Sequence, residues 1–177
     1  DPDPALDEDP GREALLARAC EALIEGGRYV SAWGVLLDRA SKCAAGASAG
    51  LDDVFPDFIE RYQRGIVPVC VSRALLRRQV VVIDGSRGRC TDCPLETARY
   101  GNASLTARME HEGALLGFIS VTISRRHAHD ADEHAYIQKI ASEVAAQLAA
   151  IEPPEHAPIR AKRSECLDSA QPEETAE

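Results

Sequence analysis

The stretch "SLTARMEHEGALLGFISVTIS", residues 104–124, constrains the fold more than any other part of this sequence. Leu105, Ala107 and Met109 alternate with polar residues, and a second alternating run, "LLGFISVT", follows. A period of two residues is typical of β-strands that bury one face, and the "HEGA" between the two runs suits a tight turn. The pattern therefore predicts an antiparallel hairpin.

The rest of the chain predicts further strands and several amphipathic helices. Residues 11–27 place Leu16, Cys20 and Leu23 on one helical face and end in two glycines, and Cys20 is expected to be a buried, inert thiol. Strands are expected at 29–38, 43–50 and 79–84, helices at 11–27, 51–65, 69–78 and 130–152, and a long loop at 85–103. Neighbouring strands joined by hairpins, with helices on one or both faces, predict an α+β protein with an antiparallel sheet.

The net charge of −9 is concentrated at the two ends of the chain. Residues 1–10 carry −5, and residues 153–177 carry six acidic and three basic side chains, which leaves −1 for residues 11–152. We expect an acidic N-terminal tail at 1–10, one domain at 11–152, and a flexible C-terminal tail or linker at 153–177. A nearly neutral domain lacks the basic face that nucleic-acid binding requires, so nucleic acid is not an expected partner.

The sequence also predicts a protein of a reducing compartment. No run of 18 or more apolar residues is present, so no membrane span is expected. The six cysteines are irregularly spaced in a chain that is long enough to fold without disulfides. We therefore expect a cytoplasmic protein with free thiols.

A pair of these thiols lies in the loop at 85–103. The stretch "RCTDCPLE" places Cys90 and Cys93 three residues apart and puts a proline after the second. This spacing lets both sulfur atoms reach one metal ion, or each other in a disulfide. The residues alone leave open a metal or haem ligand, a redox switch, a catalytic thiol and a pair with no function.

Several stretches together resemble a GAF domain, the small-ligand and redox sensing module of bacterial and archaeal signalling proteins. They are "SAWGVLLD", "GIVPVCVSRAL", "VVVIDG" with its loop, "EGALLGFISVTIS" and the closing helix to "AAIE". The resemblance covers about residues 11–152. It implies a curved antiparallel sheet of five to six strands with flanking helices, and a pocket covered by the loop at 85–103. It also implies a homodimer through helices 12–25 and 132–151, joined to a signalling module such as a histidine kinase.

In such a fold, Cys70, Cys90 and Cys93 come from segments that converge on the pocket. Thiolates suit zinc and iron–sulfur clusters, so these three cysteines are candidate metal ligands. A structural zinc site needs a fourth ligand, for which Cys43, His111 and Asp92 are only weak candidates. Haem is a further candidate cofactor, with a thiolate or His111 as its axial ligand.

The same cysteines also fit two roles without a bound cofactor. Cys90 and Cys93 could form a regulatory disulfide that changes the loop over the pocket. The alternative is an enzyme, because free methionine-(R)-sulfoxide reductases have the GAF fold and use cysteines in equivalent regions. The sequence departs from those enzymes after Cys70 and in its Cys-x-x-Cys loop, so a sensory domain without enzymatic activity is the favoured prediction.

Three histidines near the start of the last predicted helix are weaker candidates. His127, His129 and His134 lie in "RRHAHDADEH", where His-x-His spacing is compatible with a metal site. Acidic flanking residues are more typical of a solvated turn, and we expect no function from them.

Overall fold

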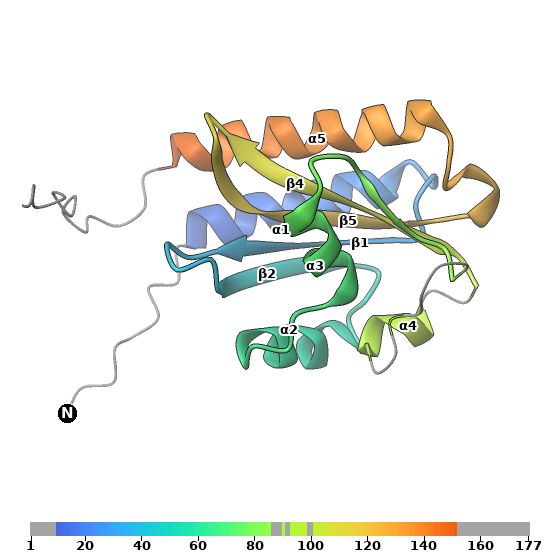
Figure 1. The fold of residues 1–177 in the computed structure, drawn as a ribbon, viewed down its shortest axis with the longest axis horizontal. Coiled ribbons are helices and arrows are strands. Elements are labelled where there is room, and N and C mark those ends of the chain that lie inside the picture. The colour runs from blue at the N-terminus through green and yellow to red at the C-terminus, as the bar shows by residue number, and fades with distance from the viewer. Residues whose placement is uncertain (1–9, 86–89, 91–92, 99–100, 152–177) are drawn as a thin grey trace, which may run out of the picture.

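The computed structural model describes residues 10–85, 90, 93–98 and 101–151, and its centre is a five-stranded antiparallel sheet (Figure 1). The strand order is β2-β1-β5-β4-β3, and every neighbouring pair is antiparallel. The strands are β1 (Ser31–Leu37), β2 (Cys43–Ala49), β3 (Val81–Ile83), β4 (Ala103–His111) and β5 (Ala114–Ile123). The predicted α+β class with an antiparallel sheet is thus confirmed, with five strands.

Helices cover both faces of this sheet. On one face, α1 packs against β1 and β2, while α5 packs against β4 and β5. On the other face, α2 lies against β2, and α3 lies against β3 and β4 (Figure 1). The helices are α1 (Pro10–Glu25), α2 (Phe55–Gln63), α3 (Val69–Leu76), α4 (Pro94–Ala98) and α5 (Ala131–Ala150), with a 3-10 turn η1 at Arg125–His127.

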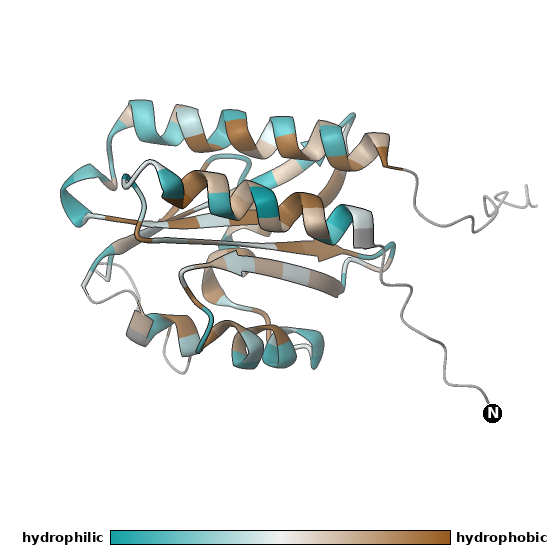
Figure 2. Cartoon of the chain, turned by 180° about the vertical axis from the view of Figure 1, so that it is seen from behind, coloured by the Kyte–Doolittle hydropathy of each residue, from teal (hydrophilic) through white to brown (hydrophobic). Residues whose placement is uncertain are grey.

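Two hydrophobic cores follow from the alternation along the strands. Leu105, Ala107 and Met109 point toward α1 and α5, as the period of two predicts. Trp33 and Phe118 point to the opposite face and pack with α2 and α3. Seen from behind in Figure 2, α1 and α5 carry hydrophobic segments over the sheet and hydrophilic segments between them. The sheet is therefore buried on both sides.

The predicted hairpin at 104–124 is present, with a two-residue turn. Glu112 and Gly113 lie between β4 and β5 with φ of 49° and 82°. Positive φ at both central positions is the geometry of a type I′ turn, whose twist matches that of the flanking strands. Glycine suits this geometry because it has no Cβ.

The segment 85–103, predicted as loop, contains one short helix within its described residues. The helix α4 begins at Pro94, where the missing N–H costs no hydrogen bond, and ends after five residues. A helix of this length has no hydrophobic period to detect, which explains why the pattern did not predict it. The predicted tails at 1–10 and 153–177 lie almost wholly outside the described residues and stay predictions.

A buried carboxylate joins the link between α1 and β1 to the first turn of α5. Glu133 is 4% exposed, accepts a hydrogen bond from the Tyr29 hydroxyl at 2.8 Å, and forms an ion pair with Arg28 at 2.5 Å. Arg28 also lies over the ring of Tyr136, 5.7 Å from its centroid. The ends of both long helices are thereby held together through one side chain.

We expect Glu133→Ala to lower the free energy of unfolding by about 2–3 kcal/mol, because it leaves the buried Tyr29 hydroxyl without its acceptor. Urea unfolding measures this loss. Glu143→Ala is the matched control, since Glu143 pairs with Lys139 at 3.7 Å on the exposed side of the same helix. That change should cost less than about 0.5 kcal/mol, and equal losses in both variants would contradict the role of Glu133.

Within the described part of the chain, no helix combines the length and the apolar character that a membrane crossing needs.

Candidate functional site

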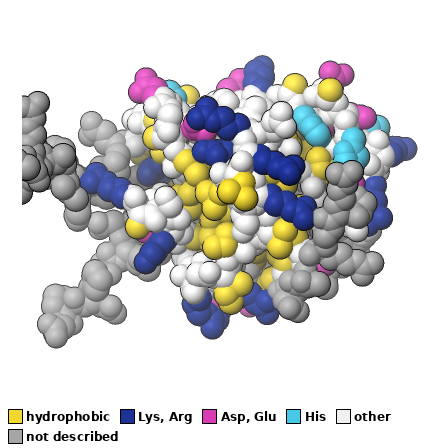
Figure 3. All heavy atoms as spheres, in the orientation of Figure 1, with side chains coloured by type: hydrophobic (Ala, Val, Ile, Leu, Met, Phe, Trp, Pro, Cys, Tyr) yellow, Lys and Arg dark blue, Asp and Glu magenta, His cyan; other side chains and the backbone are white. Residues whose placement is uncertain are grey.

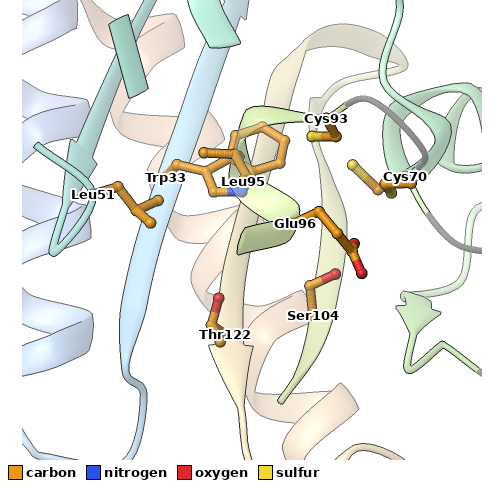
Figure 4. Close-up of a pocket in the computed structure, with 9 residues that line it drawn as sticks. Trp33, Leu51, Cys70, Cys93, Leu95, Glu96, Ser104 and Thr122 are labelled. Carbon is orange, nitrogen blue, oxygen red and sulfur yellow. The ribbon is translucent and has the colours of Figure 1, made fainter. Parts of the chain in front are cut away.

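A small cavity lies under α3 and α4, against the face of the sheet that carries Trp33. Its volume is about 20 Å³, which is room for about one water molecule. The lining comes from β1, β4, β5, α3 and α4, together with Leu51 after β2 and two cysteines before α4 (Figure 4). The lining residues are Trp33, Leu51, Cys70, Cys90, Cys93, Leu95, Glu96, Ser104 and Thr122.

The structure brings Cys70, Cys90 and Cys93 to this one cavity. Cys70 lies on the buried side of α3, in the first turn of the helix, and Cys93 immediately precedes α4. The backbone N–H of Cys93 donates to the carbonyl of Cys90 at 3.3 Å, which holds the backbones of these two cysteines close together. In Figure 4 the sulfur atoms of Cys70 and Cys93 point toward the same space.

Burial and neighbouring groups keep two of these thiols, Cys70 and Cys93, protonated at neutral pH. The Cys93 thiol donates a hydrogen bond to Cys90, and this bond together with burial raises the pKa of Cys93 well above its usual range. Burial raises the pKa of Cys70 to about 12, and the nearby Cys90 adds to this effect. Hydrogen bonds from the Val71 backbone and the Thr106 hydroxyl oppose the rise. Neutral thiols are weak nucleophiles, so fast reaction at neutral pH is not expected.

The raised pKa of Cys70 predicts a loss of stability at alkaline pH. The ordinary value is 9.0, so above about pH 9 the unfolded chain releases this proton while the folded chain retains it. The stabilising contribution is therefore complete below pH 9 and is lost as the pH rises toward 12. We expect the difference in free energy of unfolding between wild type and Cys70→Ala to change in favour of the variant from pH 9 to pH 11. Urea unfolding under reducing conditions measures it, and a difference independent of pH would contradict the assignment.

Two buried hydroxyl groups, those of Ser104 and Thr122, form the floor of the cavity, and further buried hydroxyls lie beside them in the sheet. Thr106 and Ser120 share a hydrogen bond of 2.8 Å across β4 and β5, and the Ser31 hydroxyl donates to Thr122 at 2.9 Å across β1 and β5. Burying hydroxyls without partners is costly, so this pairing lets polar groups lie beneath the thiols. Together with Ser104, these hydroxyls extend from the thiol cavity across three strands.

Sequence reasoning missed these hydroxyls, as well as Trp33 and Glu96. The signal was available in the hairpin, because Ser104 and Thr106 occupy one side of the same alternation whose other side is apolar. In a sheet covered on both faces, the polar members of a period-two pattern are buried as well. Trp33 carries no motif, although it packs against Phe58 with ring centroids 4.9 Å apart.

The structure separates His111 from the cysteines. His111 ends β4 at the hairpin turn, with a partly exposed side chain 4.0 Å from Glu112. Ser104, at the other end of β4, lines the cavity, and seven steps of about 3.3 Å place His111 roughly 23 Å farther along the strand. The structure therefore does not bring His111 to the cysteines, and its role as a cofactor-binding residue stays a prediction.

The other three histidines that the structure describes each have a partner close by. His127 contacts Asp130 at 2.8 Å, His129 contacts Asp84 at 2.8 Å, and His134 contacts the Ala128 carbonyl at 2.7 Å. His127 and His129 lie in the polar turn that the sequence predicts. No two of these contacts share an acceptor, so the histidines do not converge on one point.

The predicted cofactors do not fit this arrangement of side chains. Among the residues that the structure describes, no three His, Cys, Asp or Glu side chains are placed to hold a metal ion. Pockets for drug-sized ligands span about 300–1,000 Å³. A cavity of about 20 Å³ is therefore far too small for haem. Zinc or iron–sulfur ligation by Cys70, Cys90 and Cys93 stays a prediction without geometric support.

Comparisons with known proteins show which known fold this chain has. No protein-family model matches the sequence, and no curated protein matches it either. Solved structures do match: a GAF domain/HD domain protein from Geobacter sulfurreducens has a TM-score of 0.58 at 15% identity, over 82% of this chain and 94% of that one. The GAF domain of a phosphoenolpyruvate-protein phosphotransferase from Coxiella burnetii has a TM-score of 0.57 at 17% identity, over 82% and 86%. The chain therefore has the fold of GAF domains, as the resemblance in the sequence implies.

An enzyme has the same fold. A type II free methionine-R-sulfoxide reductase from Thermoplasma acidophilum matches with a TM-score of 0.52 at 16% identity, over 80% of this chain and 94% of that chain. Folds similar to this one thus occur in the GAF domains of the two proteins above and in a reductase. At these identities, the fold alone is shared.

Proposed function

We propose that this protein is a sensory GAF domain whose input is the thiol–disulfide state of Cys90 and Cys93. The observation that carries the proposal is their proximity: the backbone N–H of Cys93 donates to the Cys90 carbonyl at 3.3 Å, and the Cys93 thiol donates a hydrogen bond to Cys90 at the same cavity. Two thiols already in contact lose little chain entropy when they become linked. Cys70, at the same cavity, is a third thiol to which the disulfide could exchange.

The chemistry requires an external oxidant, for which a low-molecular-weight disulfide is sufficient. A thiolate formed at Cys90 or Cys93 attacks one sulfur of that disulfide, forms a mixed disulfide and releases one small thiol. The second protein thiol then attacks the mixed disulfide and releases the other small thiol. Overall, two protein S–H bonds are replaced by one S–S bond, and the two electrons and two protons are carried away by the two small thiols.

The raised pKa values of Cys70 and Cys93 determine how fast these thiols react with an oxidant. Exchange rates depend on the thiolate fraction, which is small for both thiols at neutral pH. Cys70 and Cys93 therefore suit slow exchange with the thiol pool of the cytoplasm better than rapid capture of a peroxide. Homodimer formation through helices 12–25 and 132–151, and attachment to a histidine kinase or similar module, are further proposals that sedimentation and the flanking sequence would test.

Trp33 provides a direct test, because it is the one tryptophan of the chain and lines the thiol cavity. We expect its fluorescence to change in a single two-electron transition when the protein is equilibrated with mixtures of reduced and oxidised dithiothreitol. A fluorescence signal that stays constant over the whole series, with all five described cysteines still free, would overturn the proposal.

The alternative is a methionine sulfoxide reductase that uses the same cysteines. The observation in its favour is that three thiols meet at one cavity in a fold that a solved reductase shares. The cavity volume of about 20 Å³ argues against it, because free methionine sulfoxide is much larger than one water molecule. Turnover of free methionine-(R)-sulfoxide with a dithiol reductant would establish the enzyme, and its absence would leave the sensory domain.

A further inference from the structure

The outer side of α3 and the residues before it expose apolar side chains. Leu76 is 87% exposed, Ile66 is 60% exposed, and Val67 and Leu75 are 44% and 43% exposed. We call these four residues the α3 surface. The inner side of α3 packs in the core, so the helix lies along the outside of the molecule with its other side facing outward (Figure 1).

Arginines surround the α3 surface. Residues 61–83 contain five arginines and no acidic residue, although the whole chain carries −9. Arg77 and Arg78 directly follow Leu76 and are exposed, and Arg73 lies one helical turn before Leu76 on the same side of α3. Figure 3 shows apolar side chains gathered over the centre of this face, with Lys and Arg side chains around them. The nearly neutral charge of residues 11–152 therefore conceals a local basic surface.

Neighbouring carboxylates neutralise only part of this charge. Glu60 contacts Arg64 at 2.5 Å, and Glu110 contacts Arg78 at 3.8 Å and Arg108 at 3.2 Å. The Arg108 side chain also donates to the Leu75 carbonyl at 3.2 Å, which places it beside the α3 surface. These two glutamates are set against five arginines, which leaves a net charge of +3: Arg64, Arg73, Arg77, Arg78 and Arg108.

Shape and charge together favour a lipid bilayer as the occupant of this surface. A leucine that is 87% exposed projects outward, so a protein partner needs a pocket shaped to receive it, whereas the boundary of the acyl chains accepts any apolar side chain. Arginines beside it suit lipid phosphates, to which a guanidinium donates two parallel hydrogen bonds. Nucleic acid also offers phosphates, but its backbone gives the leucines no apolar layer to enter.

We propose that the α3 surface binds reversibly to bilayers of anionic lipid, with its apolar side chains at the headgroup boundary and the surrounding arginines against the phosphates. The contact is peripheral and is independent of the proposed redox function. The negative charge elsewhere in the chain permits it at physiological salt, because charges farther than about 8 Å from the lipid are largely screened. Because α3 carries Cys70, the contact would hold the thiol site beside the membrane.

Co-sedimentation of the full chain with lipid vesicles tests this contact. Vesicles of phosphatidylcholine with about 40% phosphatidylglycerol supply the anionic surface, and vesicles of phosphatidylcholine alone are the neutral comparison. We expect the chain to sediment with the anionic vesicles at physiological salt and to stay in solution with the neutral ones. About 0.5 M NaCl should release the bound chain, because it screens the charges. A chain of net charge −9 has no general attraction to anionic lipid, so such binding requires a local basic surface.

Two double variants separate the charges from the apolar contact. Arg77→Gln/Arg78→Gln should lower the partition coefficient roughly 20-fold, since each arginine near an anionic membrane contributes about fivefold. Leu75→Ser/Leu76→Ser should lower it at least about tenfold, because the apolar side chains no longer enter the lipid. All four positions are exposed, so circular dichroism should show an unchanged fold.

The matched control is Arg125→Gln/Arg126→Gln, which removes an exposed arginine pair from η1. Phe118 pairs with Arg108, and β5 continues for five residues beyond it before η1 begins, which places the control pair about 16 Å or more from Arg108. Its partition coefficient should stay within about twofold of the wild type.

Three results would overturn the proposal. Absence of the chain from sedimented anionic vesicles would show that lipid does not cover the α3 surface. Equal sedimentation with neutral vesicles would show that the arginines play no part. Equal losses in the Arg77/Arg78 variant and in the η1 control would show that no particular surface of the protein meets the membrane.

Discussion

Gly117→Ala is expected to abolish stable folding of the domain. A Cβ atom at this position would lie 2.0 Å from the Val35 carbonyl oxygen and 2.9 Å from the Met109 side chain. The oxygen belongs to the neighbouring strand, in the ladder where Leu36 pairs with Gly117, so relief of the clash requires β1 and β5 to separate. We expect a loss of more than about 4 kcal/mol, which is comparable to the whole stability of many domains.

Circular dichroism during thermal unfolding measures this effect. Gly26→Ala is the matched control, because a Cβ there meets nothing within 4 Å. The control should change the free energy of unfolding by less than about 0.5 kcal/mol. A Gly117→Ala protein that unfolds within a few degrees of the wild type would show that the strands β1 and β5 are not packed as described.

Cys93→Ser is expected to remove the redox response of Trp33 fluorescence completely. The substitution keeps a small hydrogen-bonding side chain at the start of α4 but removes one of the two sulfur atoms that the proposed disulfide needs. The protein should remain folded, because the Cys93 side chain is only partly buried. Fluorescence in the dithiothreitol series should then be the same at every ratio of oxidised to reduced reagent.

Cys43→Ser is the matched control for this prediction. Cys43 is a buried cysteine of the same hydrophobic core, its pKa is raised to about 11 by burial, and it does not line the thiol cavity. Its variant should retain the full fluorescence transition. Loss of the transition in Cys43→Ser, or its retention in Cys93→Ser, would assign the response to a different pair of thiols.

The sequence predicted the sheet well because its hairpins depend on local patterns. The alternation around Met109 and the turn at Gly113 fix the pairing of β4 and β5 without long-range information. The helix α4 was missed because five residues are too short for a helical period. The strand β3 has three residues, fewer than its six-residue pattern suggested, because pairing with β4 ends at Ile83.

The candidate site was only partly predictable. Its lining residues depend on which end of each strand lies next to the cavity, and the sequence does not specify this. The grouping of Cys70 with Cys90 and Cys93 came from the resemblance, since no local pattern relates residues so distant in the chain. The distance of His111 from the cysteines has a physical reason: His111 occupies the turn end of β4, whereas the cavity lies at the Ser104 end. The hydroxyl floor escaped notice because a polar residue in a strand ordinarily suggests a solvated face.

Mapping of disulfides in the oxidised protein tests the central claim most directly. After equilibration with excess oxidised dithiothreitol, alkylation of the remaining thiols and digestion, mass spectrometry identifies the linked peptides. We predict a link between Cys90 and Cys93 as the main product, with Cys20 and Cys43 alkylated only after unfolding because both are buried. A protein in which Cys90 and Cys93 both remain free while other cysteines become linked would contradict a thiol switch at this cavity.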